Sequence, residues 1–282
     1  MISKIFIKIV HLNPWLQKTI WKWWYQRLAL RAREANWTFM NYGFLHDSEK
    51  VKRDLIPEDE DDRVFIQLYD YAVSRIPIEG KNVIEVGSGR GGGASFISRY
   101  HKPKHMTGLD YSSKAVKLSN EIHVNISNLS FIQGDAEKIP FENDSFDVVI
   151  NVESSHCYGN INKFISEVIR VLKPGGYFSW VDLRASSMVI DTENAFRNSD
   201  LVSIKDEVIT SNVISALDEI HDRKEDMINV HVPSWIQSAF RDFAGVKDSK
   251  IYNAFKNGNS VYLSKVFQKN HSQMVFSLHH LG

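Results

Sequence analysis

The chain has 282 residues, 43% of them hydrophobic and 24% charged, which suits one large domain with extensions or two small ones and disfavours wholesale disorder. Basic and acidic residues both number 34, so the overall charge gives no reason to expect a nucleic-acid partner. The single cysteine, Cys157, excludes an internal disulfide and a cysteine-clustered metal site. It is compatible with a reducing compartment, and we expect a cytoplasmic protein.

The first 33 residues differ from the rest of the chain in charge and in aromatic content. They hold seven basic residues, no acidic residue and four of the seven tryptophans. Lys8, Lys18 and Lys22 interrupt every run that could cross a membrane, and Lys8 also breaks the run that a signal peptide would need. Two interpretations stay open: an arm that contacts a membrane surface through residues 1–33, or a cap packed on the domain. We assign residues 1–56 to this basic, Trp-rich helical arm and a cap loop.

A helix is expected after residue 57, and strands and helices are expected to alternate from Lys81 onwards. Pro57, followed by acidic residues, predicts the start of a helix. Short apolar runs at residues 82–87, 105–110, 129–135, 146–151 and 177–183 read as strands, with helical stretches between them. This alternation is typical of a parallel, doubly wound sheet with helices on both faces. Residues 184–246 read as mainly helical and predict a helical lid, and residues 259–269 read as a last strand.

A glycine-rich loop, VIEVGSGRGGGA, lies where the first predicted strand meets the first helix. Glycines permit a tight turn there and bring backbone N–H groups close to a ligand at the helix N-terminus. Gly87, Gly89 and Gly92 satisfy the G-x-G-x-x-G pattern of dinucleotide binding. The residues from Glu85 to Gly91 also satisfy E-x-G-x-G-x-G. The loop alone therefore leaves the cofactor open.

Four further motifs follow the loop in chain order. Asp110 ends the second strand, where a carboxylate can accept hydrogen bonds from ribose hydroxyls. IQGDAEKIPF closes the third strand, SFDVVIN forms the fourth, and VLKPGGYF leads into the fifth. Together with the glycine loop, this series between residues 81 and 184 resembles class I S-adenosylmethionine-dependent methyltransferases.

That resemblance implies an α/β, Rossmann-like domain over residues 57–270, with a seven-stranded, mostly parallel sheet, helices on both faces, the N-terminal arm, the helical lid and a tail of residues 271–282. It implies S-adenosyl-L-methionine as the cofactor and no metal. The residues expected to bind the cofactor are Glu85, Gly87, Ser88, Gly89, Gly91, Asp110, Tyr111, Asp135, Ala136 and Asn151.

A histidine follows the fourth predicted strand in NVESSHCY, and an aspartate ends the fifth in SWVDL. Because ligands of an open parallel sheet bind beyond the carboxyl ends of its strands, His156 and Asp182 are expected to lie together near the cofactor. A carboxylate orients a neighbouring imidazole and stabilises the imidazolium. We expect His156 to act as a general base on a hydroxyl and Asp182 to orient it; a purely structural histidine is the alternative. Glu153 is expected to be at most a local hydrogen-bond acceptor.

The motifs NVESSHCY and LKPGGYF…DLR also resemble a narrower group, the mycobacterial phthiotriol and phenolphthiotriol dimycocerosates methyltransferases and, less closely, the rebeccamycin sugar O-methyltransferase. In the latter, residues at the positions of His156 and Asp182 form the catalytic pair. The likeness covers most of the chain after about Trp37. The chain departs from the pattern at Phe44, where relatives usually have tyrosine, and in its Trp-rich arm.

These observations predict O-methylation of a hydroxyl on a hydrophobic, lipid-like or polyketide-like small molecule. N- or C-methylation, as in quinone and sterol methyltransferases, is the alternative, although carboxylates or aromatics would then replace the His–Asp pair. An NAD(P)-dependent reductase would carry a Tyr-x-x-x-Lys pair after the fourth strand, and none follows Asn151. A non-catalytic membrane-binding scaffold would be indifferent to the loss of His156. Whether the protein is a homodimer stays open.

Overall fold

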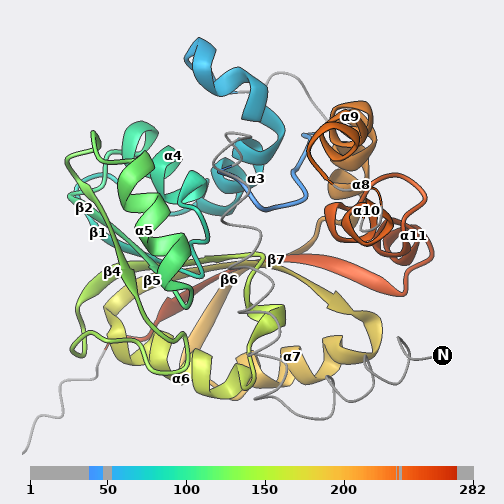
Figure 1. Cartoon of the computed structure of the whole chain (residues 1–282). Coiled ribbons are helices and arrows are strands. Elements are labelled where there is room, and N and C mark those ends of the chain that lie inside the picture. Colours follow the sequence, from blue (N-terminus) through green and yellow to red (C-terminus); the bar gives the residue numbers. More distant parts are fainter. Residues whose placement is uncertain (1–37, 47–52, 233, 235–236, 272–282) are drawn as a thin grey trace, which may run out of the picture.

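A single sheet runs through the computed structural model, which describes residues 38–46, 53–232, 234 and 237–271 (Figure 1). Its strand order is β3-β2-β1-β4-β5-β7-β6. The first five strands pair in parallel, and β7 and β6 add antiparallel strands at one edge. The strands are β1 (Asn82–Val86), β2 (His105–Asp110), β3 (Leu129–Gln133), β4 (Phe146–Val152), β5 (Leu172–Ala185), β6 (Leu201–Val208) and β7 (Ser260–Lys269). The expected seven-stranded, mostly parallel sheet is confirmed.

Helices cover both faces of the sheet (Figure 1). One face carries α3 (Arg63–Val73), α4 (Gly92–Tyr100) and α5 (Ser113–Ile122), and the opposite face carries α6 (Ile161–Val171) and α7 (Val189–Arg197). A further group lies beside α3: α8 (Thr210–Glu219), α9 (His221–His231), α10 (Gln237–Ala244) and α11 (Lys250–Lys256). Short 3-10 helices span Pro57–Asp62, Ser155–Cys157 and Ser186–Met188.

The buried side chains form one hydrophobic cluster on each face of the sheet. The first joins α3, α4, α8 and α11 to the sheet, with Leu68, Phe96, Leu217 and Tyr252 among its members. The second joins α6 and α7 to the other face through Phe164, Phe178 and Phe196. Because both faces are covered, the central strands are nearly continuous apolar runs, as parallel strands require.

Some predicted element boundaries were wrong. The segment 184–246 contains an edge strand, β6, and its helix α7 packs against α6 rather than over the carboxyl ends of the strands. Pro57 begins a 3-10 turn, and the α-helix starts only at Arg63. Asp182 does not end the fifth strand, because β5 continues to Ala185.

The predicted arm of residues 1–33 and the tail from residue 272 lie outside the described residues. Within the part of the chain that the structure describes, no helix is both long enough and apolar enough to cross a membrane.

Candidate active site

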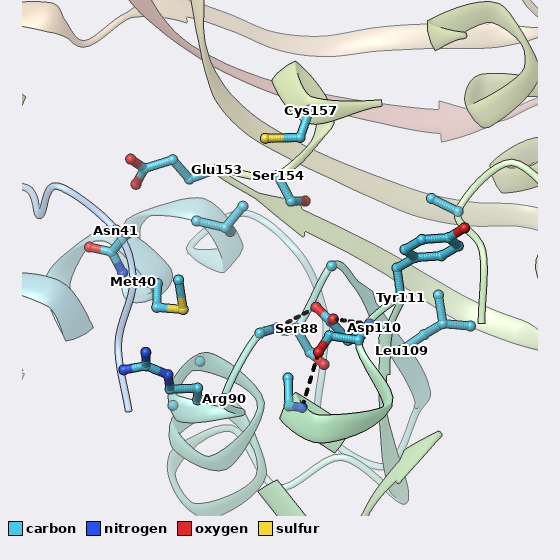
Figure 2. Close-up of a pocket in the computed structure, with 18 of the residues that line it drawn as sticks. Met40, Asn41, Ser88, Arg90, Leu109, Asp110, Tyr111, Glu153, Ser154 and Cys157 are labelled. Atoms are coloured by element: carbon cyan, nitrogen blue, oxygen red, sulfur yellow. Dashed lines mark hydrogen bonds between the residues drawn. The ribbon is translucent and has the colours of Figure 1, made fainter. Parts of the chain in front are cut away.

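A first cavity, with a volume of about 150 Å³, opens beyond the carboxyl ends of β1, β2 and β3 (Figure 2). Its wall includes seven of the residues predicted to bind the cofactor: Gly87, Ser88, Gly89, Asp110, Tyr111, Asp135 and Ala136. Glu153, Ser154 and Cys157 lie on the opposite side of the opening. The strand ends thus bring together most of the predicted set.

Two positions of the loop, Gly87 and Gly91, require glycine because the backbone there is left-handed and neighbouring atoms leave no room for a Cβ. Gly87 has φ 82° and Gly91 has φ 81°, a region that costs other residues free energy. A Cβ on Gly87 would also lie 2.3 Å from Ser154 Oγ. Gly91 is the N-cap of α4, so the loop delivers the N-terminus of that helix to the cavity.

Asp110 holds the loop in place and still faces the cavity. Its Oδ2 accepts the Gly89 N–H at 2.8 Å, and its Oδ1 accepts the Ser112 N–H at 2.8 Å (Figure 2). Burial raises the pKa of Asp110 to about 6, although both N–H groups favour the ionised form. Each carboxylate oxygen has two lone pairs, so Asp110 can also accept hydrogen bonds from a ligand.

Three predicted cofactor residues do not line the first cavity but support its wall. Gly91 caps α4, as described above. Glu85 is fully buried, accepts the Tyr69 hydroxyl at 2.7 Å, and has its pKa raised by burial to about 7. Asn151 is also fully buried, and its Nδ2 donates to Val86 O at 2.8 Å and to Ser154 Oγ at 2.7 Å. Gly91, Glu85 and Asn151 thus lie behind the residues that line the cavity and support them.

The wall of the first cavity fits a polar ligand such as S-adenosylmethionine. Ser88 Oγ is buried without a hydrogen-bond partner among the described residues, although Ser88 lines the cavity. Because buried hydroxyls are nearly always satisfied, a ligand group is the expected partner. A Cβ placed on Gly89 would lie 3.6 Å from Met40 Sδ, its nearest atom, which is an ordinary van der Waals contact. Among the described residues, no group of three or more histidine, cysteine, aspartate or glutamate side chains is placed to hold a metal ion.

His156 and Asp182 lie in contact, as predicted, because the end of β4 pairs with the part of β5 that precedes Asp182. His156 belongs to the 3-10 helix after β4, and its Nδ1 lies 2.7 Å from Asp182 Oδ1. Asp182 is fully buried and accepts three further hydrogen bonds, from the Ser155 hydroxyl at 2.6 Å, the His156 N–H at 2.9 Å and the Leu183 N–H at 2.8 Å. These bonds fix the carboxylate, and the carboxylate fixes the ring.

The two groups shift each other's pKa. Burial alone would lower the pKa of His156, but the adjacent Cys157 side chain and the Asp182 carboxylate hold it well above its ordinary value. Burial would raise the pKa of Asp182, but His156 and the Arg184 guanidinium, 3.1 Å away, hold it well below its usual range. The pair is therefore most stable as imidazolium and carboxylate.

A second cavity, of about 50 Å³, adjoins the first. Both are lined by Met40, Asn41, Arg90 and Glu153. His156 and Lys224 line only the second, whose remaining walls are aromatic or apolar: Phe39, Tyr42, Phe65, Phe243 and Ala244. The geometry therefore places a histidine with an oriented ring in a mainly apolar chamber next to the first cavity.

Sequence reasoning undervalued Glu153, which lies where the two cavities meet. Its backbone has φ 50°, and its Oε2 accepts the Tyr42 N–H at 2.8 Å and the Tyr262 hydroxyl at 2.9 Å. Burial raises the pKa of Glu153 to about 8, against the opposing effect of His156. Lys224, from α9, also lines the second cavity, and no motif in its polar helix singled it out.

The chain is similar to known methyltransferases. A family model described as "Methyltransferase domain" matches residues 78–241. The phthiotriol/phenolphthiotriol dimycocerosates methyltransferase of Mycobacterium leprae is 34% identical, over 91% of this chain and 94% of the relative. The fatty-acid O-methyltransferase of Mycolicibacterium smegmatis is 33% identical, over 87% of this chain and 88% of the relative.

Solved structures with the same fold are more distant in sequence. The geranyl diphosphate C-methyltransferase of Streptomyces coelicolor A3(2) has a TM-score of 0.65 at 14% identity and covers 90% of this chain and 97% of its own. A putative sarcosine dimethylglycine methyltransferase of Galdieria sulphuraria has a TM-score of 0.69 at 15% identity, over 87% of this chain and 98% of its own. At such identities the likeness concerns the fold alone.

Proposed function

The chain belongs to the methyltransferase family, with S-adenosylmethionine as its cofactor, and from this premise we propose that it methylates a hydroxyl oxygen of a hydrophobic, lipid-like small molecule, with His156 as general base. The observation that carries the proposal is the His156–Asp182 contact on the wall of an apolar chamber beside the cofactor cavity. The names of two relatives refer to lipids, phthiotriol dimycocerosates and fatty acids, which favours a substrate of this class.

The residues of the two cavities would have different roles in methyl transfer. S-adenosylmethionine supplies a methyl group on a positively charged sulfur. Ser88, Asp110 and the glycine loop would hold it in the first cavity. Since Nδ1 of His156 is engaged by Asp182, Nε2 is the nitrogen that would accept the proton of the attacking hydroxyl. Because the pKa of His156 is raised, the imidazolium must first lose its Nε2 proton, so the basic form is favoured at higher pH. The apolar walls of the second cavity would hold the substrate and exclude water, which keeps the hydroxyl close to the methyl group.

C-methylation is the second candidate, because a buried carboxyl group and aromatic rings surround the same chamber. Glu153 lies at its junction with the first cavity, and Phe39, Phe65 and Phe243 form its walls. A C-methyltransferase would use Glu153 and these rings to stabilise positive charge on carbon, and His156 would matter little. The two candidates therefore differ in which side chain is needed.

Replacement of His156 tests the proposal. His156→Ala should lower kcat on a lipid alcohol by about 10²–10⁴-fold, the usual contribution of a positioned base. The affinity for S-adenosylhomocysteine, measured by isothermal titration, should not change. His105→Ala is the matched control, since His105 is exposed at the far end of β2, where its Nε2 lies 2.9 Å from Ser130 Oγ. Retained activity in His156→Ala, with loss in Glu153→Gln, would favour C-methylation instead.

We also propose that α9 and α10 act as a lid, because Lys224 from α9 and Phe243 and Ala244 from α10 line the second cavity. Membrane contact through residues 1–33 stays a prediction, as does a homodimer. Co-sedimentation of the full chain with anionic vesicles, at low and high salt, tests the membrane contact, and light scattering tests the dimer.

A further inference from the structure

Lys224 is a buried lysine of α9 that lines the second cavity, and it is 5% exposed. Its Nζ donates to Ala244 O at 2.7 Å, where α10 ends. Among the described residues, no carboxylate lies within ion-pair distance of this nitrogen. An ammonium has three N–H donors, and a neutral amine has two. In either form Lys224 therefore keeps at least one N–H for which the described residues provide no further acceptor.

The positive charge of Lys224 is partly compensated without an anion. Ala244 is the last residue of α10, and the C-terminal end of a helix attracts cations. The ammonium also stands 5.6 Å from the centre of the Tyr42 ring and 5.8 Å from that of Phe65, within the range of cation–π attraction. At these distances the rings attract the charge but do not accept a hydrogen bond. What Lys224 needs from a ligand is a hydrogen-bond acceptor rather than a counterion.

Glu153 makes a neutral acceptor more favourable than an anionic one. It lines the same cavity, and its Oε2 already accepts the Tyr42 N–H and the Tyr262 hydroxyl. A ligand carboxylate would bring a second carboxyl group into this small space, whereas a hydroxyl, ether or carbonyl oxygen adds no charge. Since buried polar groups are nearly always hydrogen-bonded, a neutral ligand oxygen is the partner that fits Lys224.

The size of the second cavity limits how far this oxygen can lie from the methylated hydroxyl. The cavity volume is about 50 Å³, and both His156 and Lys224 line it. A water molecule needs about 10–15 Å³ of such space, so the cavity holds about three to five groups of that size. A substrate that reaches both side chains within this space carries its two oxygens on neighbouring carbons or on carbons separated by one more.

We propose that Lys224 selects the substrate by donating a hydrogen bond to a second, neutral oxygen beside the hydroxyl that His156 deprotonates. The substrate is then a hydrophobic molecule with a 1,2- or 1,3-dioxygenated head group. This rests on the proposed O-methylation and adds a specificity-determining residue to it. The hydroxyl oxygen bonds to the methyl carbon, the carbon–sulfur bond breaks with its electron pair on sulfur, and the hydroxyl proton passes to Nε2 of the neutral imidazole. The second oxygen is not changed.

Decane-1,2-diol and decane-1,3-diol test the inference, because each differs from 1-decanol by one hydroxyl. Methyl ether formation is measured by mass spectrometry as kcat/KM, and binding by equilibrium dialysis to the full chain saturated with S-adenosylhomocysteine. A hydrogen bond from a charged donor corresponds to about 10–100-fold in affinity, so the better diol should exceed 1-decanol by about tenfold or more in both measurements.

The variants assign this preference to one side chain. In Lys224→Met the preference for the diol should vanish, because an extra hydroxyl is costly to bury without a partner. Lys256→Met should keep the preference, since Lys256 also stands over a tyrosine ring but is exposed and lies outside the cavity. Unchanged affinity for S-adenosylhomocysteine in each variant shows that the fold is intact.

The outcomes separate the inference from the function on which it rests. No preference for either diol in the wild-type chain, a comparison that needs no variant, would overturn the role of Lys224 while O-methylation of a simple alcohol stands. A preference that survives in Lys224→Met would do the same, and so would equal weakening of diols and 1-decanol, the mark of a merely structural lysine. Failure of O-methylation itself would appear as the absence of methyl ether from every acceptor.

Discussion

Removing the charge of Asp182 should lower the pKa of His156 without removing the ring. In Asp182→Asn the side chain keeps nearly the same shape, but the anion 2.7 Å from Nδ1 is lost. An opposite charge at this range shifts a pKa by about 1–3 units, and each unit corresponds to about 1.4 kcal/mol. Burial, which lowers the pKa of His156, and the Cys157 side chain, which raises it, both remain in the variant. The pKa of His156 should therefore fall by about 1–3 units.

Nuclear magnetic resonance of ring-labelled histidine measures this pKa without any substrate. The resonance of His156 is identified by its loss in His156→Ala. Asp70→Asn is a matched control, since Asp70 lies 3.0 Å from His101 Nε2 in a separate His–Asp pair. In that variant the pKa of His156 should not move. A pKa of His156 that stays the same or rises in Asp182→Asn would refute the assignment of Asp182 as its charge partner.

The same substitution has consequences for rate and stability. If a base is needed, the acid limb of the kcat profile should move to lower pH while the plateau falls. The lowered pKa of Asp182 means that its contribution to stability is present above the unfolded value of about 3.9 and is lost as pH falls through the folded value. The raised pKa of His156 has the opposite sign, and its contribution is lost as pH rises. Because Asp182→Asn leaves Arg184 buried without its partner, we expect a loss of about 3–5 kcal/mol at neutral pH.

Three further predictions concern the walls of the cavities. Gly93→Ala should lower the free energy of unfolding by about 1–3 kcal/mol, because the new Cβ would lie 2.0 Å from the Tyr69 ring. Alanine favours helices more than glycine does, so a stabilised variant in urea titrations would contradict this prediction. At pH values below about 6, where Asp110 becomes protonated, the affinity for S-adenosylhomocysteine should decrease. Asp110→Asn should bind weakly at every pH without this decrease. An equally steep decrease in the variant would exclude Asp110 as the group whose protonation weakens binding. The free energy of unfolding should rise between about pH 7 and about pH 10, because in this range Lys224 binds fewer protons in the folded state than in the unfolded state. Denaturant titrations of Lys224→Met should show a smaller rise.

The sequence allowed the His156–Asp182 contact to be predicted, because it depends on topology and on local signals. β4 and β5 pair in parallel, with Val152 opposite Val181, so residues just beyond these positions must be neighbours. Strand runs, the glycine loop and the turn before β5 are all recognisable over a few residues. The cofactor wall was predictable for the same reason.

The second cavity could not be predicted in this way, because its residues come from distant parts of the chain. Tyr42 and Tyr262 reach Glu153 from 111 and 109 residues away, and neither carries a local motif. Lys224 lies in a polar helix, and only its burial beneath the Tyr42 ring distinguishes it from the other lysines. β6 was missed for a different reason. It is an exposed edge strand with charged residues, and such strands lack the apolar alternation on which strand prediction depends.

Glu153 connects the fold of the site to its chemistry. Its left-handed backbone costs free energy, of the order of 1–3 kcal/mol, and persists only because its surroundings hold it there. Its N–H donates to Val181 O, and its carboxyl group accepts hydrogen bonds from the Tyr42 N–H and the Tyr262 hydroxyl. Tyr42 in turn donates its hydroxyl to Phe243 O, close to the carbonyl that Lys224 binds. The helices that close the second cavity are thus linked to the residue at the junction of the two cavities, so occupation of one cavity should alter the order of the other.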